Sequence, residues 1–147
     1  MKLSLKGVLV GGLVDIAASV LFGLPFAIYE MTKVDLSHTP SAQASTALTH
    51  AIRSNVPLYI GQLLVGLACS VLGGYVAAWL AKHDELLNGF FSSFLCVALG
   101  IYTMVSGKDS NALWVQMLLL LASPALGLVG GDLMRRLRLR RSRFQLA

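Results

Sequence analysis

The sequence predicts an all-α fold, a polytopic membrane protein built as a four-helix antiparallel transmembrane bundle. Of its 147 residues, 56% are hydrophobic and only 13% are charged, about half the charge of an average soluble domain. Four stretches of 20 or more residues are apolar, which is the length that a helix needs to cross a bilayer. No stretch alternates as the strands of a membrane barrel do, so helices remain as the structure that satisfies its own backbone hydrogen bonds in lipid. This composition excludes a disordered chain, a soluble nucleic-acid binder and an ordinary cytosolic enzyme.

The predicted spans form a single membrane domain over residues 1–133, and they are residues 7–28, 57–81, 86–105 and 112–133. The first span is interpreted as an uncleaved anchor, because it is longer than the apolar region of a signal peptide. Four residues, 82–85, separate the second and third spans, which are therefore expected to be antiparallel neighbours. Residues 106–111 contain glycine, aspartate and asparagine and are expected to form a turn.

The first connection, residues 29–56, is long enough to have structure of its own. Thr39 suits the N-cap of a helix, Pro40 suits its first position, and the apolar residues that follow recur at helical spacing. We therefore expect a short helix over about residues 40–52. It would lie on the outer face of the membrane or pack over the mouth of the bundle, and the sequence favours neither placement.

The distribution of lysine and arginine predicts the orientation of the chain. The N-terminus, the second connection and the tail at 134–147 carry nine of the 12 Lys and Arg residues, and the other two connections carry three. Because short cytoplasmic segments are enriched in these residues, both termini are expected to be cytoplasmic. The tail is expected to bind anionic lipid of the inner leaflet, and nucleic acid is not an expected partner. Its arginines are Arg135, Arg136, Arg138, Arg140, Arg141 and Arg143.

Small residues at four-residue spacing predict where the helices pack against one another. Helices in lipid associate where small side chains let backbones approach closely, and 13 of the 14 glycines lie within the predicted spans. The expected packing residues are Gly7, Gly11, Ser19 and Gly23 in the first span, Gly66, Ser70, Gly73 and Gly74 in the second, and Gly127 and Gly131 in the fourth. Cys69 and Cys96 are also interpreted as small packing residues.

Asp15 is the one carboxylate expected deep inside a span, about 13 Å along the helix from Lys6. A charge near the bilayer centre costs about 2.5–3.5 kcal/mol, and burial favours the neutral form of a carboxyl group. We expect Tyr75, Ser93 and Ser123, which lie at similar depth, to be its hydrogen-bond partners. Two interpretations stay open, since Asp15 would either bind a proton or cation or fix helix packing as a neutral hydrogen-bonding group.

The other polar residues point to no chemistry. Asp132 is expected to form a surface ion pair with Arg135 or Arg136, whereas Glu30 and Glu85 are expected to be interfacial and solvated. The histidines lack metal-ligand spacing, and the chain has no nucleophile elbow, P-loop or dinucleotide-binding motif. We therefore expect no metal, no cofactor and no enzymatic activity.

Two resemblances follow from particular residues. The run Gly73-Gly74-Tyr75-Val76-Ala77-Ala78, continuing to Gly89, resembles a signature of many small four-span bacterial membrane proteins of unknown function. This resemblance covers the second and third spans and implies a bacterial inner-membrane protein without implying an activity. Small multidrug-resistance transporters have four spans and an acidic residue midway along the first, after a glycine pair, which is similar to Gly11-Gly12 before Asp15. Their acidic residue is glutamate, their loops are short, and their tryptophan- and tyrosine-rich motifs are absent here.

The sequence thus predicts a non-catalytic inner-membrane protein that acts by helix–helix packing with itself, as a homo-oligomer, or with a membrane-protein partner. The alternative is a proton-coupled small transporter or ion pathway that uses Asp15. Four helices enclose little volume, so a pathway of this kind would need an oligomer.

Overall fold

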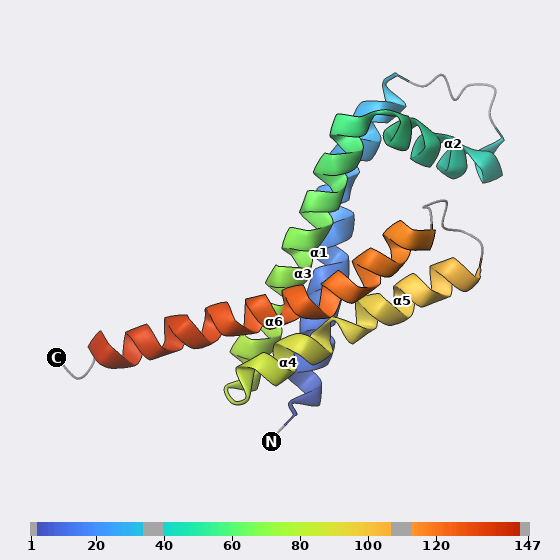
Figure 1. Ribbon diagram of the computed structural model, residues 1–147. Coiled ribbons are helices and arrows are strands. Elements are labelled where there is room, and N and C mark those ends of the chain that lie inside the picture. The colour runs from blue at the N-terminus through green and yellow to red at the C-terminus, as the bar shows by residue number, and fades with distance from the viewer. Residues whose placement is uncertain (1–2, 34–39, 107–112, 145–147) are drawn as a thin grey trace. The chain divides into compact units, whose positions relative to one another are not determined.

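The computed structural model describes residues 3–33, 40–106 and 113–144 (Figure 1). All regular secondary structure in these residues is helical: α1 (Leu5–Met31), α2 (Ser41–Ser54), α3 (Val56–Ala81), α4 (Glu85–Ser92), α5 (Phe94–Val105) and α6 (Leu113–Phe144). Four segments of these ranges are long and apolar enough to cross a membrane, namely α1, α3, α4 together with α5, and α6 as far as Arg141. The all-α class is confirmed for the described residues, and the four long apolar helices fit a multi-pass membrane protein.

The third span differs from its prediction because it is two helices. The helix breaks at Ser93, whose N–H bonds to the carbonyl of Phe90 at 3.3 Å. One residue earlier, the Ser92 hydroxyl donates to the carbonyl of Gly89 at 2.7 Å. A serine hydroxyl that bonds back to its own helix in this way tends to bend it. The hydrogen bond from Ser92 to Gly89 therefore accounts for the interruption at Ser93.

The fourth span also differs, since α6 continues through most of the basic tail and ends at Phe144. Residues 134–144 are leucine, arginine and other residues that tolerate a helix, and they include no glycine or proline. Leucine and arginine are among the better helix formers, so nothing in this stretch ends the helix. The predicted tail is therefore a helical extension of the last span over residues 134–144.

The short helix of the first connection is present as α2, close to its predicted bounds. Pro40 takes the N-cap position instead of the first helical position, and its carbonyl accepts the N–H groups of Gln43 and Ala44 at 2.8 and 3.1 Å. The predicted cap Thr39 lies outside the described residues. Residues 107–111 of the predicted turn also lie outside them.

The chain divides into two compact units, Met1–Ala17 with Leu67–Ala147, and Ala18–Gly66. The first unit contains the start of α1, the end of α3 and all of α4, α5 and α6. The second contains the rest of α1, α2 and the start of α3. Each of the two long helices therefore contributes to both units.

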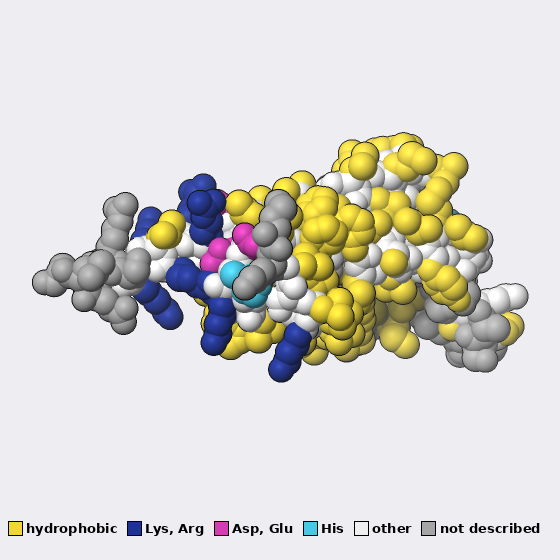
Figure 2. Space-filling view, turned by 90° about the horizontal axis from the view of Figure 1, so that it is seen from below, with side chains coloured by type: hydrophobic (Ala, Val, Ile, Leu, Met, Phe, Trp, Pro, Cys, Tyr) yellow, Lys and Arg dark blue, Asp and Glu magenta, His cyan; other side chains and the backbone are white. Residues whose placement is uncertain are grey.

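Apart from Met134, the buried apolar residues of the first unit are small. Cys69, Ala77, Ala78 and Ala81 are at most 4% exposed, whereas large side chains such as Leu121 are turned outward. Hydrophobic side chains cover much of the face seen in Figure 2, and Lys and Arg gather near the acidic side chains. Small side chains inside and large ones outside are expected where lipid surrounds the helices, because a leucine side chain gains nothing by being hidden from lipid.

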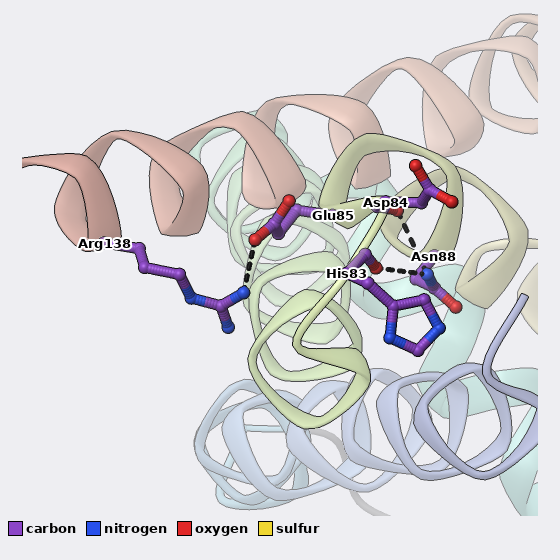
Figure 3. A network of polar contacts seen from close by, with 5 residues as sticks. All are labelled: His83, Asp84, Glu85, Asn88 and Arg138. Carbon is purple, nitrogen blue, oxygen red and sulfur yellow. Dashed lines mark hydrogen bonds and ion pairs between the residues drawn. The ribbon is translucent and has the colours of Figure 1, made fainter. Parts of the chain in front are cut away.

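The connection between α3 and α4 turns sharply. Lys82 and Asp84 both have positive φ, 59° and 43°, which side chains rarely adopt. The buried side chain of Asn88 holds the turn, because its Nδ2 donates to the carbonyls of His83 and Asp84, each at 3.0 Å (Figure 3). Its Oδ1 accepts the N–H of Ser4 at 2.8 Å. One amide therefore ties the start of α1 to this turn.

Candidate functional site

Glycines of the first unit bring four helices into backbone contact. A Cβ placed on Gly11 of α1 would lie 2.6 Å from the carbonyl oxygen of Gly73 of α3. A Cβ on Gly74 would lie 2.8 Å from the Cα of Gly127 on α6, and one on Gly131 would lie 2.6 Å from the carbonyl oxygen of Glu85 on α4. No other residue type fits these contacts without moving a backbone.

The small-residue rows are packed over only part of their length. Gly7 lies against the backbone of Ala77, but no described atom lies within 4 Å of the position that a Cβ would take on Gly23 or Gly66. Ser19 is half-buried. A four-residue row turns by about 40° per step on an ideal helix, so Gly23 faces about 160° away from Gly7. The rotation explains why the far ends of the predicted rows are open.

Asp15 lies within the glycine contacts of the first unit and is 3% exposed. Its Oδ2 accepts a hydrogen bond from the Cys96 thiol of α5 at 3.0 Å, and its Oδ1 accepts a longer one from the Ser70 hydroxyl of α3 at 3.5 Å. A Cβ on Gly73 would lie 2.7 Å from the Cβ of Asp15. The glycine is therefore what lets the carboxylate lie against α3.

The partners expected for Asp15 are largely wrong. The hydroxyls of Ser93 and Ser123 are buried without a hydrogen-bond partner among the described residues, so neither bonds to Asp15. The Ser93 hydroxyl instead lies where a side chain on Gly127 would be. Tyr75 is half-buried, and its backbone nitrogen faces Gly130. These three residues were chosen by depth along the span, which does not determine the side of the helix on which a side chain lies.

The interpretation of Cys96 as a packing residue missed its hydrogen bond to Asp15. Ser70 belongs to the row of small residues predicted in the second span, and Cys96 lies four residues from Ser92 and from Gly100 in the third. Such rows mark the faces that meet other helices. A hydroxyl or thiol within a row is therefore the signal that could have identified both donors.

A charged cluster lies where α4 begins (Figure 3). The carboxylate of Glu85 accepts a hydrogen bond from the Arg138 guanidinium of α6, and the two side chains are only 16% and 34% exposed. The prediction that Glu85 is solvated is therefore wrong, because the helical tail brings an arginine to it. The predicted surface pair is present between Asp132 and Arg136, with Nε and Oδ2 2.6 Å apart.

The second unit has a buried acid of its own. Glu30 is 4% exposed and accepts a hydrogen bond from the side-chain amide of Asn55 at 3.1 Å, so the prediction that Glu30 is solvated is also wrong. Lys33 extends beyond α1, with its Nζ 4.3 Å from the centre of the Tyr29 ring. A hydrogen bond with Tyr29 raises the pKa of Lys33 above its ordinary value.

No group of three or more His, Cys, Asp or Glu side chains that could hold a metal occurs within residues 3–33, 40–106 and 113–144. Comparison of the chain with known protein families, curated proteins and solved structures found no match. The two resemblances noted in the sequence therefore stay predictions.

Proposed function

We propose that this chain is a non-catalytic protein of the bacterial inner membrane, an antiparallel four-helix bundle with both termini in the cytoplasm. It acts by packing its helices against a second copy of itself or against a membrane-protein partner. The observation that carries this proposal is that no described atom lies within 4 Å of the position that a Cβ would take on Gly23 or Gly66. A glycine inside a helix costs about 1 kcal/mol relative to alanine, and an open glycine in lipid offers close approach to another helix.

The arginines of α6 support an interaction with anionic lipid. Arg135, Arg136, Arg140 and Arg141 are exposed, whereas Arg138 bonds to Glu85. Each basic side chain near an anionic membrane surface contributes about 1 kcal/mol of attraction. Because the tail is helical, these charges continue directly from the last span and would meet the head groups of the cytoplasmic leaflet.

The packing function is tested by a substitution that fills the open space. We expect Gly66→Leu to dissociate the oligomer of the full-length protein in lipid vesicles, measured by cross-linking at graded protein-to-lipid ratios. The matched control is Ala68→Leu, which introduces the same side chain at an exposed position two residues along α3. Equal cross-linking of both variants and wild type would remove this face from the proposal.

A second candidate function is proton or cation binding at Asp15. Both carboxyl oxygens accept hydrogen bonds from donors on other helices, which is an arrangement that tolerates an ionised carboxylate. The broken third span lies beside it, since a Cβ on Gly12 would meet the Ser92 carbonyl at 2.9 Å.

Asp15→Asn separates the two functions. Under the transport function, the variant keeps its fold and loses a pH-dependent proton flux that wild type shows in vesicles. Under the packing function, wild type shows no such flux and the variant loses stability or assembly. Asp132→Asn is the control, because it removes a carboxylate from the partly exposed ion pair with Arg136.

A further inference from the structure

The close approach of α4 and α6 leaves an apolar groove on the surface of the first unit. The two backbones meet where Gly131 faces Glu85 and Leu86, and where Gly127 faces Gly89. Larger side chains cannot enter this contact, so they stand on either side of it. The resulting groove has a volume of about 660 Å³. Its lining residues are Leu86, Leu128, Val129, Asp132, Leu133 and Arg136.

The walls of the groove suit a hydrocarbon chain. Three α6 residues, Leu128, Val129 and Leu133, are 37%, 55% and 48% exposed although they are apolar. Leu86 of α4 forms the remaining apolar part of the lining. A groove of this kind at the end of a membrane span is filled by acyl chains rather than by water.

The polar end of the groove suits a phosphate group. Arg136 bonds to Asp132 through Nε, so its terminal Nη groups keep their donors for another acceptor. Its side chain is 74% exposed. Arg140 follows four residues later, on the same face of α6, and is also exposed. Asp132 is neutralised by Arg136, which leaves the positive charge of Arg140 in excess.

We propose that this groove binds one anionic phospholipid. An acyl chain lies along Leu86, Leu128 and Val129, and the phosphate lies between Arg136 and Arg140. The proposal rests on the proposed function in one respect, which is that the basic end of α6 lies at a membrane surface. It goes further by naming a single lipid site, in contrast to a diffuse attraction between the tail and the leaflet.

The site is tested with the full-length protein in an uncharged detergent. Binding of phosphatidylglycerol, and of phosphatidylcholine with the same acyl chains, is measured by native mass spectrometry. We expect one phosphatidylglycerol molecule to bind in preference to phosphatidylcholine. Arg136→Gln should weaken that binding about fivefold, the loss expected for one basic side chain at the surface. Lys6→Gln, which removes an exposed charge outside the groove, should leave it unchanged.

A second variant tests the apolar half of the site. Val129→Trp fills the groove and should weaken the binding of both lipids. Leu121→Trp is the control, because it introduces the same side chain at a 78% exposed position of α6 outside the groove. Melting temperatures of all variants, followed by thiol labelling of Cys69 and Cys96, show that the fold is retained.

Three results overturn the lipid site. Equal weakening by Arg136→Gln and Lys6→Gln means a diffuse charge effect, which leaves the lipid-bound tail of the proposed function intact. Complete competition by inorganic phosphate means an anion site without an acyl chain. Loss of self-association in Val129→Trp, with lipid binding unchanged, means that a second copy occupies the groove.

Discussion

Replacing Gly74 with alanine tests whether glycines hold the helices of this protein together. The added Cβ would lie 2.8 Å from the Cα of Gly127 and 2.9 Å from its carbonyl carbon. Carbon atoms in contact prefer about 3.5–4.0 Å, so α3 and α6 must separate by several tenths of an ångström. Gly127 also lies against Gly89 of α4, so a shift of α6 disturbs a second contact. Overpacking of this kind costs about 1–3 kcal/mol.

Gly66→Ala is the matched control, two turns away in the same row of α3. No described atom lies within 4 Å of its new methyl group, so the variant gains only the helix propensity of alanine, about 0.5–1 kcal/mol. Because Gly74→Ala gains the same helix propensity, the free energies of unfolding of the two variants should differ by the overpacking cost alone, about 1–3 kcal/mol. The assay is unfolding in mixed detergent micelles, followed by circular dichroism under conditions in which the protein is monomeric.

The reasoning fails if Gly74→Ala is as stable as Gly66→Ala. That result would mean that α3 and α6 are separated by side chains at Gly74. If both variants instead lose stability by the same amount, added bulk is not tolerated anywhere along α3.

Three further predictions concern polar groups of the first unit. Ser93→Ala should raise the melting temperature, because it removes a buried hydroxyl without a described partner and recovers about 1 kcal/mol. Ser92→Ala is its control and should lower stability by about 1 kcal/mol, since it removes a hydrogen bond that the structure makes. A loss of stability in Ser93→Ala, or a gain in Ser92→Ala, would contradict the assignment. A double-mutant cycle with Glu85→Gln and Arg138→Gln should give a coupling of about 1 kcal/mol that falls with added salt, whereas a coupling of zero would mean no ion pair. Asn88→Ala should lower the free energy of unfolding by about 3 kcal/mol, because the Asn88 side chain makes three hydrogen bonds. A loss below about 1 kcal/mol would contradict this prediction.

The donors to Asp15 mark the limit of prediction from sequence. Distance along a span follows from counting residues at 1.5 Å each, so the depth of Asp15 follows from its position alone. Which residues meet it depends on the rotation of each helix about its own axis. The break at Ser93 separates α5 from α4, and the Cys96 thiol of α5 is what meets Asp15. Counting along a continuous third span carries no information about that break.

The two buried acids illustrate the same limit. Glu30 and Glu85 lie at the ends of spans, where solvation is the ordinary expectation. Asn55 reaches Glu30 because the chain returns from α2 into α3 beside it, and Arg138 reaches Glu85 because α6 does not end at the membrane boundary. Neither partner lies near its acid in the sequence.

The sequence by itself determined the helical class, the four membrane segments and the short α2, because hydropathy, length and helix propensity are local properties of the chain. It also marked the glycines that meet other backbones at Gly11, Gly73, Gly74 and Gly127. Only the tertiary structure decided which glycines contact another helix and which, like Gly66, have no described atom within 4 Å of a Cβ position. It also decided which donors reach Asp15. The physical reason is that both depend on the rotation and separation of helices distant in sequence, which are determined by packing between their surfaces.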